Sequence, residues 1–217
     1  IEKYFLEAEN DYAIPFLLFV PDNPSETGLL YLHPDGKSAF SSNNEEIELL
    51  MKKGITILIP DLTGIGELGP ATSRRTTHRT ELFAASLVSK SVLGIQASDV
   101  VKLRRSLTGY FHKNKIYGLS YNYLSSVLLH AAAFDDSIER ILMINPYISY
   151  YSIATNEFYS PGYTGSIVPY ALTGYDLPDL AASLAPRKLI YVNTLDGSGR
   201  EADSRADEND IEFIRTS

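Results

Sequence analysis

One stretch constrains the fold more than any other: an apolar run from Lys115 to Leu119 passes through Ser120 directly into a segment with helical spacing. The pattern Gly118-Leu119-Ser120-Tyr121-Asn122 is typical of a sharp strand-to-helix turn that raises a serine hydroxyl at the end of a sheet. Asn122 stands where the usual pattern has a second glycine. A serine at such a turn can also simply cap the helix, so the rest of the chain must decide between the two interpretations.

Apolar runs and helical segments alternate along the chain. The runs at 28–33, 55–60, 140–145 and 188–193 predict buried strands, and helices are expected at about 42–53, 93–107 and 177–184. This order requires parallel strands joined by right-handed crossovers. Aromatic-rich runs around Asn10-Asp11 predict an N-terminal antiparallel hairpin, and Pro15 favours an edge strand there. We therefore expect the α/β class, a mostly parallel sheet with helices on both faces, in a single domain spanning residues 1–217.

The composition excludes several classes of function. A formal net charge of −8 argues against a nucleic-acid or anionic-membrane partner. No stretch approaches the roughly 20 apolar residues of a membrane span. Cysteine is absent, which removes disulfides, thiolate chemistry and cysteine-bound metals. It also leaves the compartment open, and we favour a secreted or periplasmic one.

Neither a cofactor nor a metal is expected. Residues Gly64 to Gly69 formally match the dinucleotide pattern G-x-G-x-x-G, but Pro70 and a polar Thr/Arg run follow them instead of a helix. Asp135 and Asp136, like Asp203 and Asp207, are interpreted as solvated helix ends because no histidine accompanies them.

Polar residues follow four of the predicted strands. They are the stretch from His33 to Gly36, then Asp61 with its glycines, Ser120 and Asp196. The carboxyl ends of parallel strands share one edge of the sheet, where ligands bind in folds of this kind. A nucleophile, a carboxylate and a donor loop on one edge is the arrangement that acyl transfer requires.

This ordered set of motifs resembles the α/β-hydrolase family. The segment from Tyr175 to Lys188, with its leucine-rich stretch and Ala185-Pro186-Arg187, is similar to the acetyl-xylan-esterase-like branch of the carbohydrate esterases. The resemblance covers nearly all 217 residues. It implies a serine ester hydrolase whose substrate is a small-molecule or carbohydrate acyl ester, acetyl esters above all.

The resemblance also assigns roles. It makes Ser120 the nucleophile, Asp196 the acid that orients a histidine, and the backbone N–H groups of Tyr121 and Asp35 the oxyanion-hole donors. The order of serine before aspartate fits this fold. Pro34 replaces a usual glycine of the oxyanion loop. Asp35 and Asp196 each precede a glycine, so an ordinary turn remains the alternative for both.

The catalytic histidine is missing from its expected place. The fold puts it beyond Asp196, after one further strand, and no histidine follows that residue. The four histidines present are His33, His78, His112 and His130. None is a good base; His130, for example, stands ten residues along the helix from Ser120, ~15 Å away at the helical rise. Because the chain ends at Ser217, before an eighth strand, we expect either a truncated hydrolase or a relative that has lost its histidine.

Two functions therefore remain open. The first is a serine esterase that is weak or inactive as the chain stands. The second is a non-catalytic carbohydrate-binding or scaffolding module on the same fold. Residues 147–175 form a Tyr-rich insertion, which is expected either to present a sugar-binding face or to pack on the edge of the sheet.

Overall fold

The computed structural model describes residues 1–7, 12–69 and 79–202. The strands are β1 (Glu2–Glu7), β2 (Ala13–Phe19), β3 (Thr27–Leu32), β4 (Thr56–Pro60), β5 (Lys115–Tyr121), β6 (Ile138–Ile144) and β7 (Lys188–Val192). The helices are α1 (Ala39–Ser42), α2 (Asn44–Lys52), α3 (Arg79–Leu87), α4 (Val92–Gly109), α5 (Leu124–Phe134), α6 (Tyr150–Ala154) and α7 (Leu177–Ser183). The predicted turn at Asn10-Asp11 lies outside the described residues, and so do Asp203 and Asp207.

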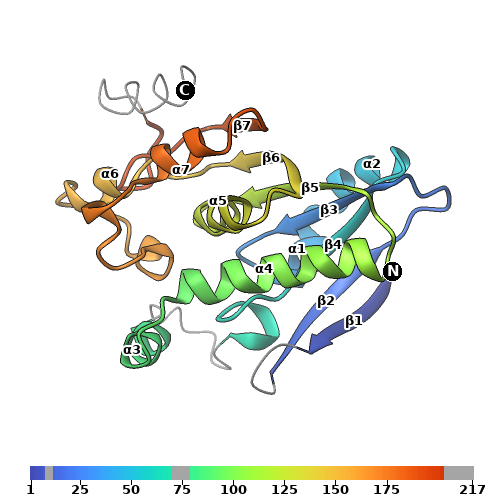
Figure 1. Ribbon diagram of the computed structural model, residues 1–217, viewed down its shortest axis with the longest axis horizontal. Helices are drawn as coiled ribbons and strands as arrows, with labels where there is room; N and C mark the ends of the chain where they lie inside the picture. Colours follow the sequence, from blue (N-terminus) through green and yellow to red (C-terminus); the bar gives the residue numbers. More distant parts are fainter. Residues whose placement is uncertain (8–11, 70–78, 203–217) are drawn as a thin grey trace.

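The strands form one sheet in the order β1-β2-β4-β3-β5-β6-β7 (Figure 1). All pairings from β4 to β7 are parallel, whereas β1 pairs antiparallel with β2 and β2 antiparallel with β4. The predicted fold class and hairpin are confirmed. The edge position predicted from Pro15 is wrong, because β1 is the edge strand and Pro15 lies in β2 between two neighbours. Its carbonyl accepts a hydrogen bond from Asp61 N at 2.9 Å.

Successive side chains of the central strands point to opposite faces of the sheet, and this divides the core into two layers. Leu30, Leu32 and Leu58 belong to the larger layer, while their neighbours Leu29 and Ile57 belong to the smaller one. Because successive strand residues point to opposite faces, these runs must be apolar throughout to be covered on both sides. This is why the buried strands appear in the sequence as continuous apolar runs.

The helices cover the two faces unequally. Helices α4, α5 and α7 pack against the larger core layer, and α1 and α2 against the smaller one (Figure 1). The long helix α4 begins at Ser91, whose hydroxyl accepts a hydrogen bond from Gly94 N at 2.9 Å and so satisfies a donor of the first turn.

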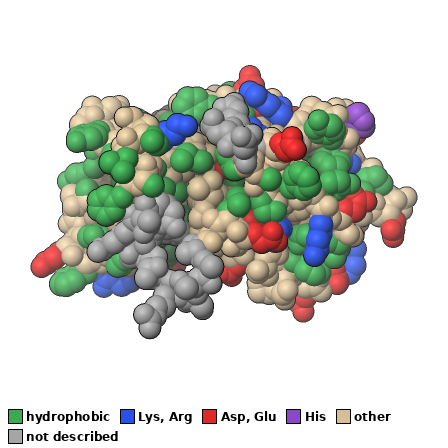
Figure 2. Space-filling model, turned by 90° about the horizontal axis from the view of Figure 1, so that it is seen from below, with side chains coloured by type: hydrophobic (Ala, Val, Ile, Leu, Met, Phe, Trp, Pro, Cys, Tyr) green, Lys and Arg blue, Asp and Glu red, His purple; other side chains and the backbone are tan. Residues whose placement is uncertain are grey.

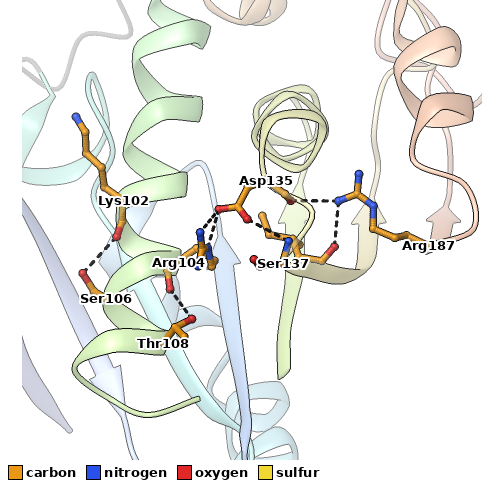
Figure 3. A network of polar contacts seen from close by, with 8 residues as sticks. Lys102, Arg104, Ser106, Thr108, Asp135, Ser137 and Arg187 are labelled. Carbon is orange, nitrogen blue, oxygen red and sulfur yellow. Dashed lines mark hydrogen bonds and ion pairs between the residues drawn. The ribbon is translucent and has the colours of Figure 1, made fainter. Parts of the chain in front are cut away.

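A buried ion pair joins α4 to the end of α5. Asp135 is 6% exposed and pairs with Arg104, whose Nε lies 2.7 Å from a carboxylate oxygen (Figure 3). Arg187, just before β7, donates to the carbonyl oxygens of Asp135 and Ile138. The interpretation of Asp135 as a solvated helix end is therefore wrong. It failed because its partner lies 31 positions earlier in the sequence.

Apolar side chains also reach the surface. Phe83 and Leu87 of α3 and the following Val88 are exposed. Figure 2, a view from below, shows apolar side chains spread over this face of the molecule, with charged side chains between them mainly on the right. Among the described residues, no helix has the length and apolar character needed to span a membrane.

Candidate functional site

The junction of β5 and α5 forms the sharp turn that the sequence predicts. Gly118 lets α5 pack closely on the strand, because a Cβ there would lie 2.7 Å from Leu128 Cδ1 of that helix. The chain turns at Asn122, which has a left-handed φ of 52°. Asparagine tolerates this conformation better than most residues with a side chain. The apex of the turn is thus Asn122, two positions after Ser120.

Ser120 lies within β5 and not at the apex. Its residue exposure is 0%, and its hydroxyl donates to Ser125 Oγ at 3.1 Å. Ser125, on the first turn of α5, is itself 2% exposed. The Ser120 hydroxyl therefore ties the strand to the helix and has no access to solvent.

Tyr121 points to the opposite face of the sheet. Its hydroxyl donates to Glu46 Oε2 at 2.6 Å, and burial together with this bond raises the Tyr121 pKa well above its ordinary value. Tyr31 bonds the same carboxylate oxygen at 3.1 Å and accepts a bond from Asn43 Nδ2 at 2.6 Å. This cluster was not foreseen, because Glu45 and Glu46 suit an ordinary acidic helix start, and only the tertiary fold brings Glu46 to Tyr121.

The other expected oxyanion donor, the Asp35 N–H, already forms a hydrogen bond within the loop after β3. The Asp35 N–H donates to His33 Nδ1 at 3.1 Å, while the Asp35 side chain is 67% exposed. Because Nδ1 accepts this bond, the neutral ring carries its proton on Nε2. Burial lowers the pKa of His33, although Asp35 and Glu46 act in the opposite direction. His33 is accordingly neutral near pH 7.

Asp61 holds two glycine turns in place beside this loop. Its carboxylate accepts from Lys37 N at 2.7 Å and Glu67 N at 2.9 Å, one bond on each oxygen. A Cβ at Gly36 or Gly66 would lie about 2 Å from this carboxylate, at 2.1 and 2.2 Å respectively. The stretch Gly64–Gly69 is thus a turn folded around Asp61, with a short 3-10 helix at Gly66–Leu68. This geometry does not present the helix N-terminus that a dinucleotide needs.

Asp196 follows β7 at the carboxyl edge of the sheet. Its Oδ1 accepts bonds from Ser198 N, Ser198 Oγ and Arg200 N at 2.8, 2.7 and 3.0 Å. Burial favours a higher pKa, but these bonds and the Arg200 charge hold the Asp196 pKa below its usual value. The carboxylate organises its own turn, and none of the described histidines bonds to it.

None of the described histidines forms a hydrogen bond with Ser120 or Asp196, although His33 lies one residue beyond Leu32, which pairs with Ser120. His33 braces its loop, and His112 is exposed beyond α4. His130 is buried in α5, where Nδ1 donates to the Ser126 carbonyl at 2.7 Å and Nε2 accepts from the Tyr175 hydroxyl at 2.9 Å. His78 lies outside the described residues. No group of three or more metal-binding side chains occurs within the described ranges.

The Tyr-rich segment between β6 and α7 is divided between core and surface. Tyr147, Tyr150 and Tyr163 are buried, and the Tyr147 and Tyr150 hydroxyls donate to the Ser166 carbonyl at 3.0 and 3.3 Å. Asp176 caps α7 and also accepts from Tyr150 N at 2.6 Å, so it fixes α6 to α7. The exposed members are Tyr151, Tyr159 and Tyr170. Much of the segment therefore packs on the edge of the sheet.

A polar cavity of about 600 Å³ lies beside the β5–α5 turn, on the face covered by α1 and α2. His33, Glu46 and Tyr121 line it together with Ser41, Ser42, Asn43, Asn44 and Glu45. In this cavity His33, which directly follows β3, and Tyr121, the last residue of β5, meet side chains of α2.

Comparison with known proteins identifies the fold. No family model and no curated protein matches the sequence. A candidate acetyl xylan esterase from Bacteroides fragilis aligns over 98% of this chain with a TM-score of 0.74 and 16% identity. An esterase from Pyrococcus furiosus aligns over 99% with a TM-score of 0.63 and 14% identity. The ferulic-acid-bound Est1E from Butyrivibrio proteoclasticus aligns over 98% with a TM-score of 0.59 and 13% identity.

This chain covers a different fraction of each of those structures. This chain spans 61% of the Bacteroides fragilis structure, 78% of the Pyrococcus furiosus one and 97% of Est1E. At such low identity the agreement concerns the path of the backbone. Together with the strand order, it leads to one conclusion: the chain has the α/β-hydrolase fold that these esterases share.

Proposed function

We propose that this chain is a carbohydrate-binding module built on an esterase-like α/β-hydrolase fold, and that it binds its ligand without cleaving it. One observation carries the proposal: the apex of the strand-to-helix turn is Asn122, while the Ser120 hydroxyl is fully buried against Ser125. A serine can attack an ester only if its oxygen reaches the carbonyl carbon and a base lies within hydrogen-bond reach. Neither condition is met among the described residues.

The choice of ligand rests on the fold neighbours and on the surface chemistry. The structures with the same backbone include a candidate acetyl xylan esterase and an esterase bound to ferulic acid. The polar cavity beside the turn is lined by amides, hydroxyls and two carboxylates. Tyr151, Tyr159 and Tyr170 add exposed rings, and rings of this kind stack on the apolar faces of sugars.

A serine esterase is the second candidate. It is favoured by the placement of Ser120 at the end of β5 and of Asp196 beyond β7, because the carboxyl ends of parallel strands lie on one edge of the sheet. In this mechanism Ser120 attacks the ester carbonyl, the N–H groups of Tyr121 and Asp35 stabilise the oxyanion, and Asp196 orients a histidine from outside the described residues. This mechanism requires the β5–α5 turn to open so that the Ser120 hydroxyl becomes accessible. It also requires the Asp35 N–H to give up its hydrogen bond to His33 Nδ1.

Two measurements on the protein distinguish the candidates. The first is labelling with a fluorophosphonate probe together with turnover of p-nitrophenyl acetate. The second is retention on immobilised acetylated xylan. Binding without hydrolysis predicts retention with neither labelling nor turnover. Stoichiometric labelling and turnover that disappear in Ser120→Ala would refute the binding proposal and establish the esterase.

A further inference from the structure

The cavity beside the β5–α5 turn has the features of a preformed ligand site. It combines side chains from the loop after β3, from α1 and α2, and from the end of β5. Its volume of about 600 Å³ lies in the range of small-molecule sites. Ser120 and Asp35 do not line this cavity, and Tyr121 lines it with its side chain, whereas the oxyanion-hole role discussed for Tyr121 belongs to its backbone N–H.

Glu46 provides a fixed hydrogen-bond acceptor in this cavity. Its Oε2 accepts from the hydroxyls of Tyr121 and Tyr31 at 2.6 and 3.1 Å. Its Oε1 bonds to no other described residue. The two tyrosines hold the carboxylate in one orientation. Binding of a ligand to the remaining oxygen would therefore cost little conformational entropy.

His33 provides a donor and an aromatic surface. Because its Nδ1 accepts from Asp35 N at 3.1 Å, its Nε2 carries the proton and can donate. The ring stacks with Tyr31 at a centroid distance of 6.4 Å and meets the edge of Tyr121 at 4.9 Å. His33 and Glu46 therefore bring a donor and an acceptor, each held by hydrogen bonds to the protein, to the lining of one cavity.

The charge of the cavity restricts its ligand. Glu45 and Glu46 line it, and no lysine or arginine does so in the described part of the chain. An anionic ligand would be repelled and would find no positive partner. A neutral molecule with several hydroxyl groups fits, because each hydroxyl both donates and accepts, and the amides of Asn43 and Asn44 offer both functions as well.

We infer that this cavity binds one neutral sugar residue of the polysaccharide ligand, with Glu46 as its central acceptor. The inference rests on the proposed function and gives it a location. It differs from the sugar face first expected in residues 147–175, which lie outside the lining of this cavity.

The test measures binding of xylotriose by calorimetry, alongside retention on acetylated xylan, for the unmodified chain and three variants. Glu46→Gln removes the charged acceptor. Ser41→Trp fills the cavity from an exposed position whose side chain bonds to no other described residue. Glu139→Gln, exposed at the amino end of β6, is the control of matched charge. Circular dichroism verifies that each variant is folded.

The expected result is binding weakened by about tenfold or more in Glu46→Gln and Ser41→Trp, and unchanged in Glu139→Gln. A trigalacturonate should bind at least about tenfold more weakly than xylotriose, because of its carboxylates. If the unmodified chain binds xylotriose and both cavity variants bind it equally well, the assignment of the cavity is overturned and the proposed function stands. Equal binding of trigalacturonate overturns the neutral class of ligand. If the unmodified chain binds neither xylotriose nor acetylated xylan, the proposed function fails and this inference with it.

Discussion

The carboxylate of Asp61 should matter to stability out of proportion to its size. It is 1% exposed and accepts two backbone N–H groups, from Lys37 and Glu67, on separate oxygens. Each hydrogen bond to a charged group contributes roughly 1.5–3 kcal/mol. Asp61→Ala should therefore lower the free energy of unfolding by roughly 3–6 kcal/mol, a large part of the 5–15 kcal/mol typical of a domain.

The informative variant is Asp61→Asn. An amide offers only one acceptor oxygen, and its NH₂ group would face the second backbone donor. We expect Asp61→Asn to retain the size of the side chain and still to cost at least about half as much as Asp61→Ala. Lys37→Met, which removes the 3.4 Å ion pair with Asp61 and the 2.6 Å ion pair with the exposed Glu67 but neither backbone bond, should cost only about 1 kcal/mol.

Urea unfolding followed by circular dichroism measures these differences, with equal m-values required for the comparison. The reasoning is refuted if Asp61→Asn unfolds within about 0.5 kcal/mol of the unmodified chain. It is refuted as well if Lys37→Met costs as much as Asp61→Asn, since the ion pair would then be the main contribution.

Three further predictions can be tested in the same way. Asp135→Ala should cost about 3–5 kcal/mol because it leaves Arg104 charged and unpaired. Asp136 is exposed, and Asp136→Ala should change the free energy of unfolding by less than about 0.5 kcal/mol. Equal losses in the two variants would contradict the buried ion pair. Burial lowers the His130 pKa below its ordinary 6.5. As the pH falls, the unfolded chain therefore takes up this proton first, and the free energy of unfolding falls below about pH 6.5. His130→Gln should flatten this pH dependence in unfolding curves measured between about pH 5 and 8. If the pH dependence is unchanged in His130→Gln, it does not come from His130. Gly36→Ala should cost roughly 3 kcal/mol or more in urea unfolding, since φ is +56° and the new Cβ would lie 2.1 Å from Asp61 Oδ1; a neutral effect would mean that the turn can relax.

Local pattern was sufficient for the elements and their class. The continuous apolar runs and the helical spacing between them predicted β3 to β7 and α4, α5 and α7, because a strand covered on both faces needs apolar residues at every position. The same logic predicted the turn at Gly118–Asn122 and the glycine-rich loop after β4. These features depend on residues close together in the chain.

Tertiary structure decided what the site contains. The pattern Gly-x-Ser-x-Asn does not reveal which residue takes the left-handed conformation, since this depends on where α5 packs against β5. In the folded chain Asn122 takes it, and Ser120 is buried. The contact between Glu46 and Tyr121 joins positions 75 residues apart.

What the sequence by itself determined is therefore the order of strands and helices along the chain and which polar residues follow the strand ends. What only the tertiary structure decided is which side chains face that edge, which are buried, and which meet across the fold. The physical reason is that backbone propensity and burial are encoded locally, whereas the exposure and the hydrogen-bond partners of a side chain depend on segments that come together only when the chain folds.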